Sequence, residues 1–242
     1  MQRYFAKGIY NDKIVLLDSD IHHIKNVMRM QIGVKIDVVY ANKLYICSIE
    51  KFDPFSLKIE DITQENKNLY FNITMAIGLI KEQKMDLVLQ KLTELGVSEI
   101  IPLEMERSIV KIDRQRMQKK KVRWQTICKE ASEQSKRMNI PNITDVMTIK
   151  ELVKMEADVK LIASTKERNK MLDYYLQRVD KYAKIIMVVG PEGGISDKEE
   201  DFLLNNGFNS VSFGDLILRV ETAAIYAGVI FNFYSSRGEK ND

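Results

Sequence analysis

The chain has 242 residues, enough for one large domain or two small ones. Its apolar content of 45% and charged content of 29% are typical of a globular protein with a sizeable core. No apolar run is long enough to span a membrane, and residues 1–13 are too polar for a signal peptide, so we expect a cytoplasmic protein without membrane contact. Cys47 and Cys128 lie far apart in the sequence, and we expect both to be buried thiols in a reducing compartment.

Residues 1–70 predict a small β-rich domain. Short apolar or alternating runs are separated by turn residues, which is typical of strands. The runs are Lys13–Leu17, Val34–Tyr40, Leu44–Glu50 and Leu57–Ile62. One helix is expected among them, from about Ser19 to Met30. Its apolar side chains share one face: Ile21, Ile24, Val27 and Met28.

The pair His22-His23 suggests a metal site at first sight. Adjacent side chains on a helix do not face one another, however, and no Cys or Asp cluster supplies further ligands. We therefore predict no metal.

From residue 71 the pattern changes to alternating strands and helices. The polar stretch Glu65–Leu69 is the expected linker. After it come predicted strands at Ile73–Ile80, Ile100–Leu103 and Val159–Ala163, and predicted helices at Gln83–Leu95, Arg114–Arg137 and Met171–Arg178. Such alternation predicts an α/β domain with a mostly parallel sheet over residues 71–242.

Positive charge is concentrated in the middle of the chain. Between Arg107 and Arg137 there are eleven Lys or Arg and three acidic residues, a local charge of +8 within a total of +3. Such a run is usually a solvated helix face. The arginines and the single Trp124 favour a polyanionic partner, because arginine pairs with phosphate and aromatic rings stack on bases. We expect Trp124 itself to pack in the core of the protein and not to stack on a base.

A glycine-rich turn follows the apolar strand Ile185–Val189. The turn is Gly190-Pro191-Glu192-Gly193-Gly194, and Ser196 and Glu199 then have the spacing of a capping box at the start of a helix. Glycines let a backbone approach a ligand closely, so this stretch predicts a small-molecule site. A nucleotide phosphate is the competing ligand, but no Lys-Ser/Thr follows the glycines, Pro191 lacks an amide hydrogen, and Glu192 places a carboxylate where phosphate would lie.

A second strand, Ser210–Phe213, ends in the turn Gly214-Asp215 and leads to a helix that is apolar on most sides and ends near Tyr234. Arg219 and Glu221 interrupt the apolar run where this helix begins. On residue chemistry alone they form either a functional pair or a structural ion pair that holds the helix end.

These residues carry a resemblance. The turn 190–194, together with Gly214, Ile217-Leu218-Arg219 and Glu221-Thr222-Ala223, resembles the paired signature of the RsmE family, and the similarity covers nearly the whole chain. This family consists of bacterial 16S rRNA methyltransferases of the SPOUT class, which use S-adenosylmethionine to methylate N3 of one uridine. The resemblance implies a PUA-like RNA-binding barrel in residues 1–70 and a SPOUT α/β domain with a trefoil knot in residues 71–242.

The resemblance also implies where S-adenosylmethionine would bind. In this sequence the three knotted loops would be Ala163–Lys166, Gly190–Gly194 and Phe213–Ala223. The implied cofactor-binding residues are Ser164, Thr165, Val189, Gly190, Pro191, Glu192, Gly193, Gly194, Phe213, Gly214, Ile217, Leu218, Arg219, Thr222 and Ala223. We expect the glycines to stand where a side chain would collide with adenosine.

The implied catalytic residues are Arg219 and Glu221. A fixed guanidinium can stabilise negative charge on the uracil oxygens, and Glu221 either orients Arg219 or accepts the N3 proton. The residues expected to contact RNA are Arg29, Lys81, Arg107, Arg114, Arg116 and Arg137. The apolar last helix and the family resemblance imply a homodimer.

Two other functions stay open at this point. A SPOUT enzyme that acts on another RNA, such as tRNA, would share the cofactor loops. A non-enzymatic RNA-binding protein would need only the barrel and the basic helix, and would have no reason to keep both glycine turns and the pair Arg219 and Glu221.

Overall fold

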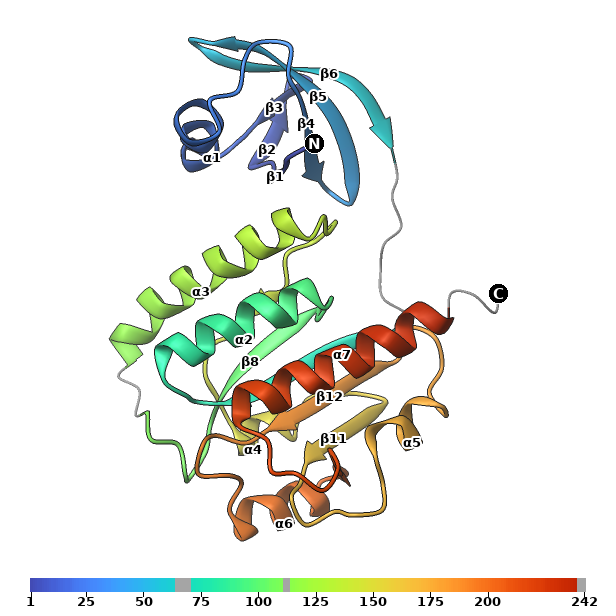
Figure 1. Cartoon of the computed structure of the whole chain (residues 1–242). Coiled ribbons are helices and arrows are strands. Elements are labelled where there is room, and N and C mark those ends of the chain that lie inside the picture. The colour runs from blue at the N-terminus through green and yellow to red at the C-terminus, as the bar shows by residue number, and fades with distance from the viewer. Residues whose placement is uncertain (64–70, 111–113, 239–242) are drawn as a thin grey trace. The chain divides into compact units, whose positions relative to one another are not determined.

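The computed structural model describes residues 1–63, 71–110 and 114–238 (Figure 1). The predicted linker Glu65–Leu69 lies outside the described residues. The chain divides into two compact units, one formed by residues 1–68 with 129–140, the other by residues 69–128 with 141–242.

The first unit is built on antiparallel strands. Among the described residues, β4 (Lys35–Tyr40), β5 (Lys43–Phe52) and β6 (Phe55–Thr63) form consecutive antiparallel pairs, and β1 (Arg3–Phe5) joins β4 in parallel. The strands β2 (Gly8–Tyr10) and β3 (Lys13–Val15) form a separate hairpin. Alternate side chains of these strands fill one core, and Cys47 is buried in it as a free thiol, as expected. Burial raises the pKa of this thiol to about 12, which makes it unreactive.

The helix of this unit departs from a regular α-helix. It begins as α1 (Asp18–His22) and continues as a π-helical turn at His23–Val27, in which the amide of Met28 donates to the carbonyl of His23. A π turn widens the helix and shifts the side chains that follow it. Ile24 is therefore buried, whereas Val27 and Met28 are exposed, so the prediction of one common apolar face was wrong for these two.

Residues 129–140 belong to this unit although they follow the second unit's first strands in sequence. Lys129 contacts Asp20 of α1 at 2.6 Å and Glu133 at 2.7 Å, and all three side chains are largely buried. Arg3 pairs with Asp37 at 3.2 Å and donates to the carbonyl of Lys136. The first unit is therefore completed by a segment that local sequence patterns place in the second domain.

The second unit is built on a parallel sheet. Among the described residues, seven strands lie in the order β10-β8-β7-β12-β11-β13, with β9 beside β8, and every pairing is parallel. The strands are β7 (Asn72–Gly78), β8 (Glu99–Glu104), β9 (Asn142–Ile143), β10 (Met147–Thr148), β11 (Val159–Ala163), β12 (Lys184–Val189) and β13 (Asn209–Val211). The prediction of an α/β domain with a mostly parallel sheet is confirmed. The trefoil knot stays a prediction.

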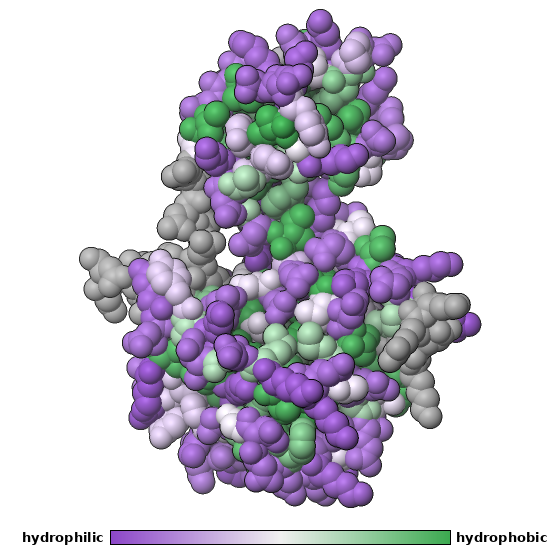
Figure 2. Space-filling model, turned by 180° about the vertical axis from the view of Figure 1, so that it is seen from behind, coloured by the Kyte–Doolittle hydropathy of each residue, from purple (hydrophilic) through white to green (hydrophobic). Residues whose placement is uncertain are grey.

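Helices cover both faces of this sheet (Figure 1). On one face α2 (Glu82–Glu94) packs against α7 (Val220–Gly238), so closely that a Cβ on Gly228 would lie 3.0 Å from Leu92. On the other face, side chains of α4 (Ile149–Leu152) and α6 (Asp197–Asn205) share a core with β8, β11 and β12. The remaining helices of this unit are α3 (Arg114–Gln134), whose last residues belong to the first unit, and α5 (Leu172–Leu176). Away from α2 and α7, the surface of this unit has hydrophobic and hydrophilic side chains interspersed (Figure 2).

The predicted helix signals of this unit are confirmed. The stripe of α2 is fully buried at Met85, Val88 and Leu89, and Gly96 ends the helix with a positive φ of +92°. Gly207 does the same after α6, with φ of +85°. No helix in the described part of the chain is long and apolar enough to cross a membrane.

Candidate cofactor and catalytic site

The glycine-rich turn begins where β12 ends in the middle of the sheet. Strand β12 is buried between β7 and β11, and after Val189 the chain turns so that the amide of Gly194 donates to the carbonyl of Pro191 at 2.8 Å. The turn lies against the end of β7. A Cβ on Gly78 would come within 2.5 Å of the backbone nitrogen of Pro191, so only glycine fits there.

The helix after the turn is capped as the sequence predicts. Ser196 and Glu199 form the reciprocal capping box of α6. The loop after β8 fastens to the same helix start, because Ser196 Oγ donates to Glu106 at 2.7 Å and the amide of Glu106 donates to Glu199 at 2.7 Å. Arg107 adds a hydrogen bond of 3.2 Å to the carbonyl of Ile195. The end of the turn is thus held from two elements.

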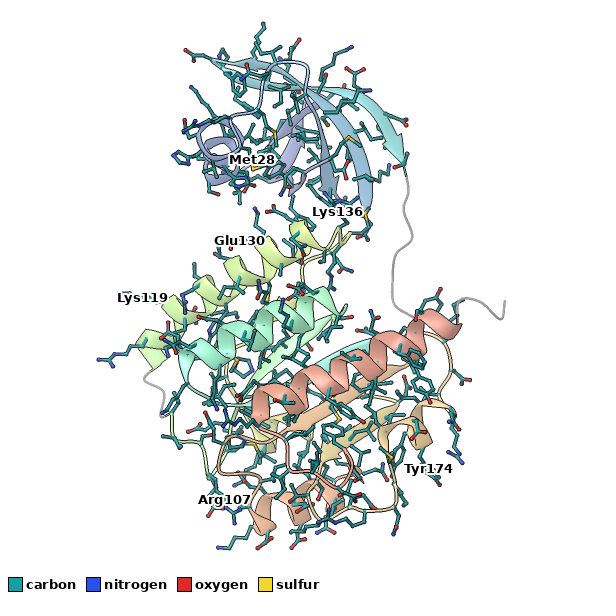
Figure 3. All side chains as sticks on the ribbon, in the orientation of Figure 1. Met28, Arg107, Lys119, Glu130, Lys136 and Tyr174 are labelled. Carbon is teal, nitrogen blue, oxygen red and sulfur yellow. The ribbon has the colours of Figure 1, made fainter. Side chains whose placement is uncertain are left out.

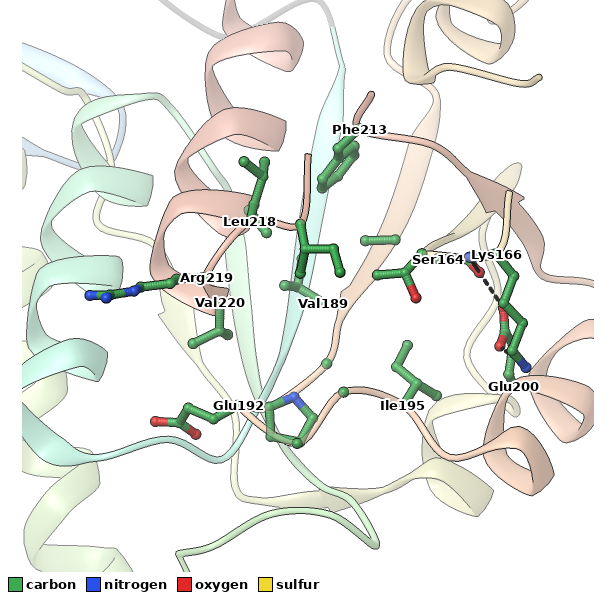
Figure 4. A pocket seen from close by; sticks show the side chains of 18 of the residues that line it. Ser164, Lys166, Val189, Glu192, Ile195, Glu200, Phe213, Leu218, Arg219 and Val220 are labelled. Atoms are coloured by element: carbon green, nitrogen blue, oxygen red, sulfur yellow. Dashed lines mark hydrogen bonds and ion pairs between the residues drawn. The ribbon is translucent and has the colours of Figure 1, made fainter. Parts of the chain in front are cut away.

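A cavity of about 610 Å³ opens between this turn and two further loops (Figure 4). Its walls come from Ala163–Lys166 after β11, from the turn, and from the loop that joins β13 to α7. Every residue that the resemblance assigned to the cofactor lines it except Thr222, which is exposed outside the cavity. Glu221 is also absent from the lining.

The glycines of the cavity have different reasons to be glycine. A Cβ on Gly190 would collide with Ile195 at 2.7 Å, and one on Gly193 would collide with Arg107 at 2.8 Å. Gly194 and Gly214 have positive φ angles of +73° and +96°, and a Cβ there would enter open space. Contact with protein therefore explains two of these glycines, and backbone conformation contributes at the other two.

Arg219 and Glu221 do not form the ion pair that was one interpretation of the sequence. Glu221 instead pairs with Lys84 of α2, whose Nζ lies 3.2 Å from Glu221 Oε2 and 3.6 Å from Glu192 Oε1. Burial opposes ionisation of Glu221, but a backbone hydrogen bond, Lys84 and the more weakly acting charge of Arg219 outweigh it and hold its pKa below the usual range. A carboxylate held ionised in this way is a weak proton acceptor.

Arg219 directly precedes α7, and its carbonyl accepts from the amide of Ala223 at 2.8 Å. Its side chain is exposed and has no hydrogen bond or ion pair with the described residues. Figure 4 shows it at the same end of the cavity as Glu192. A free guanidinium thus stands at the rim, beside a carboxylate.

The opposite end of the cavity carries a polar cluster that sequence reasoning missed. Glu200 of α6 is only 6% exposed, accepts a hydrogen bond from Ser164 Oγ and pairs with Lys166 at 2.7 Å (Figure 4). Lys166 also pairs with Asp197 at 2.6 Å. These hydrogen bonds raise the pKa of Lys166 well above its usual range. The signal in the sequence was a carboxylate three residues before the apolar Leu203, on the buried face of a helix.

The residues predicted to contact RNA are distributed over both units. In the first unit Arg29 is exposed, and Arg137 is half-buried with a hydrogen bond to Asn139. In the second, Lys81 is exposed at the start of α2, and Arg116 is exposed on α3. Arg107 lines the cavity. The side chain of Arg114 lies outside the described ones.

Much of the positive charge of α3 is neutralised within the second unit. Arg123 binds Asp86 at 2.6 Å and Glu82 at 2.5 Å, both on α2, and Lys121 pairs with Asp145 at 2.8 Å. Trp124 is 3% exposed, which confirms that it is a core residue. Arg116 and Lys119 are exposed and have no partner among the described residues, so they remain available to a ligand. Figure 3 shows Lys119 near the start of α3.

Comparison with known proteins identifies the family. A family model described as an RNA methyltransferase domain matches residues 66–232, and one described as an RNA methyltransferase PUA domain matches residues 16–61. The ribosomal RNA small subunit methyltransferase E of Bacillus subtilis is 33% identical over 94% of this chain and 94% of its own length. The chain belongs to the RsmE family of RNA methyltransferases.

Solved structures of the RsmE family agree with this fold. The ribosomal RNA small subunit methyltransferase E of Neisseria gonorrhoeae, bound to S-adenosyl methionine, has a TM-score of 0.86 with 30% identity, covering 96% of this chain and 97% of that one. A methyltransferase of Legionella pneumophila with the bound cofactor SAM has a TM-score of 0.88 with 31% identity and the same coverage. The RsmE assignment thus holds for both units of the chain.

Within the described residues, no group of three or more His, Cys, Asp or Glu side chains could hold a metal ion. His23 instead shares a hydrogen bond with the hydroxyl of Tyr4 at 3.0 Å.

Proposed function

We propose that this RsmE-family chain is an S-adenosylmethionine-dependent methyltransferase that methylates N3 of a uridine in 16S rRNA. One observation carries the proposal: a single cavity is lined by three loops of the parallel sheet, and a free guanidinium stands at its rim. The family membership supplies the reaction class, and relatives named for ribosomal RNA of the small subunit support the substrate.

The residues of the cavity suit this cofactor. A volume of about 610 Å³ lies in the range of small-molecule sites. The open space beside Gly194 and Gly214 leaves room for a ligand against the backbone. Val189, Leu218 and Ala223 give apolar walls, while polar groups stand at both ends. When bound, S-adenosylmethionine would supply a methyl group activated by its sulfonium.

Uridine N3 becomes a nucleophile only after it loses its proton, so the protein must favour the anionic base. We assign this task to Arg219, whose guanidinium makes no hydrogen bond or ion pair with the described residues and can donate to a uracil oxygen as charge develops there. Glu192 lines the cavity whereas Glu221 does not, so Glu192 is the better placed acceptor for the proton. The ion pair of Glu221 with Lys84 instead holds the start of α7 against α2.

We further propose that residues 1–70 act as the PUA-like RNA-binding domain and residues 71–242 as the methyltransferase domain, in a homodimer. Val229 and Phe233, four residues apart on α7, are 48% and 47% exposed, while Ala224, Ala227 and Phe231 are buried. This exposed apolar stripe supports a partner subunit. A ribosomal RNA substrate would place the enzyme in the cytoplasm.

The test is transfer of a tritiated methyl group from S-adenosylmethionine to small ribosomal subunits, to free 16S rRNA and to tRNA. We expect label in ribosomal RNA, released after digestion as 3-methyluridine. Label in tRNA alone would support a SPOUT enzyme with another substrate. The absence of both transfer and cofactor binding would support a non-enzymatic RNA-binding protein.

A further inference from the structure

The far end of the cavity is organised around one buried carboxylate. Glu200 lies in the first turn of α6, directly after the glycine-rich turn, and its side chain is almost inaccessible to solvent. One of its oxygens accepts from Ser164 Oγ, and the other contacts Lys166 Nζ at 2.7 Å. Both partners belong to the loop after β11, so Glu200 joins that loop to α6, the helix that follows the glycine-rich turn.

Ser164 connects this pair to the third loop. Its amide donates to the carbonyl of Val211 at 3.0 Å, at the end of β13, and its hydroxyl accepts from the amide of Lys166 at 3.1 Å. The chain after β13 enters the last cavity loop, where the amide of Gly214 donates to Ser212 Oγ at 3.2 Å. The conformation of the loop Ala163–Lys166 is therefore fixed from β13 on one side and from Glu200 on the other.

Stability alone does not explain a carboxylate at this position. Removing the Glu200 carboxylate from water is costly, and its ion pair with Lys166 regains little of that cost, because the Lys166 side chain is 56% exposed. Glu200 lies on the helix face that carries the buried Leu203, and Leu would suit that surrounding. The charge therefore has a use other than holding the core together.

We propose that Glu200 is a positioning residue for the cofactor. It holds Ser164 and Lys166 so that the loop Ala163–Lys166 has the conformation that contacts the bound ligand. This inference rests on the assignment of the cavity to S-adenosylmethionine. Glu200 acts through the loop, and Lys166, which is half-exposed and also paired with Asp197, closes the loop at the surface.

The decisive variant is Glu200→Leu. A positioning role predicts that the melting temperature without ligand stays equal or rises, while the dissociation constants of S-adenosylmethionine and S-adenosylhomocysteine rise about tenfold or more, the size of one lost charged hydrogen bond. Isothermal titration calorimetry measures the constants on the full chain. Glu200→Gln should lose less affinity, because its amide oxygen can still accept from Ser164.

Matched variants separate this role from a general effect on α6. Asp201→Asn changes the exposed neighbouring carboxylate, and it should leave both constants unchanged. Ser164→Ala should weaken binding as well. The double variant with Glu200→Leu should bind no more weakly than the weaker-binding single variant, because both substitutions remove the same link. Additive losses would mean that the two residues act separately.

Cofactor binding by the wild-type chain is the reference for these variants. If the wild type does not bind S-adenosylmethionine, the cofactor assignment itself is wrong. If the wild type binds and Glu200→Leu binds equally well, Glu200 does not position the loop. A Glu200→Leu chain with a lower melting temperature but the wild-type affinity for S-adenosylmethionine would show that the carboxylate serves stability only.

Discussion

The ammonium of Lys84 lies 3.2 Å from a carboxylate oxygen of Glu221 and 3.6 Å from one of Glu192. One cation on α2 thus joins the first turn of α7 to the glycine-rich turn. The two carboxylates that the sequence places near the reaction are in different situations as a result. Glu221 is committed to Lys84 and does not line the cavity, whereas Glu192 lines it and is only loosely held.

The substitution Lys84→Met should remove the ion pair with Glu221 and thereby change how the stability of the fold depends on pH. In the wild type the pKa of Glu221 is lowered, so Glu221 contributes stability above the usual glutamate pKa of about 4.3, and loses it as the pH falls through its own lower pKa. Without Lys84 this contribution shrinks. We expect a loss of about 1.5 kcal/mol at pH 7, or roughly 3–6 °C in Tm. The difference in stability between the wild type and Lys84→Met should become smaller below pH 4.

The matched control for this prediction is Lys91→Met on the same helix. Lys91 pairs with Glu94 at 2.9 Å within the same helix, where both side chains stay partly exposed, and such pairs contribute little. Its effect on Tm should be small at every pH. A loss in Lys84→Met that is equal at pH 3.5 and pH 7 would show that packing, and not the charge, is what Lys84 provides.

Gly194→Asn and Gly214→Asn should weaken cofactor binding without unfolding the chain. Both glycines have positive φ, which a β-branched residue cannot adopt without strain, whereas Asn tolerates it. The added side chain would enter the open space beside the cavity. We expect calorimetry to show at least a ~10-fold rise in the dissociation constant of S-adenosylmethionine, or about 1.4 kcal/mol.

Gly207→Asn is the control for the glycine variants. Gly207 also has a positive φ and open space beside it, but it follows α6 and does not line the cavity. This variant should have the same small effect on stability and none on binding. Unchanged affinity in all three variants would place the cofactor elsewhere.

Much of this architecture could be predicted from local sequence signals. The stripe of α2, the capping box at Ser196 and the stop at Gly96 act over one or two turns of chain, so their patterns are visible in the sequence. The strands β9 and β10 have two residues each, too short for any periodicity. The π turn at His23–Val27 likewise has no sequence pattern that distinguishes it from an α-helix.

The interactions that complete the site could not be predicted in this way. Lys84 meets Glu221, and Ser164 meets Glu200, only because the sheet brings distant segments together. The same holds for residues 129–140, whose largely buried Lys129 is paired with Asp20. Local patterns assigned Lys129 to a basic surface, and only the tertiary fold shows that its charge is internal.

Arg116 and Lys119 should contribute to RNA binding. Both are exposed on α3 and have no partner among the described residues, in contrast to Arg123, which binds two carboxylates of α2. Exchanging both for Gln should lower the affinity for a 16S rRNA fragment. The slope of log K against log salt should also fall, by about 1 for each phosphate that is no longer neutralised. Arg123→Gln should lower Tm but leave the slope unchanged. A slope that is the same in all variants would remove α3 from the RNA surface.

Val229→Glu with Phe233→Glu should dissociate the proposed homodimer. Two charges on the exposed stripe of α7 would be costly to bury in an interface of ~1,000 Å² or more. Sedimentation at micromolar concentration should show a dimer for the wild type and a 28.1 kDa species for the variant. Val122→Glu, on the 69% exposed Val122 of α3, should stay dimeric. A wild type that sediments only as the 28.1 kDa species would contradict the homodimer.

Arg219→Ala should impair methyl transfer while sparing the fold. Because the guanidinium is exposed and makes no hydrogen bond or ion pair with the described residues, its removal should leave Tm and cofactor affinity near those of the wild type. The single-turnover rate should fall by ~10²-fold or more, the usual effect of removing one charge-stabilising donor. Arg219→Lys should restore little of the rate, since a point charge does not replace a planar fork.

The pH dependence of the rate distinguishes the possible roles of Arg219. If Arg219 stabilises the uracil anion, the rate of the Ala variant should climb more steeply than that of the wild type at alkaline pH. Parallel pH profiles with intact cofactor binding would mean that Arg219 only positions the base, and a joint loss of stability and cofactor affinity would mean that it serves the fold.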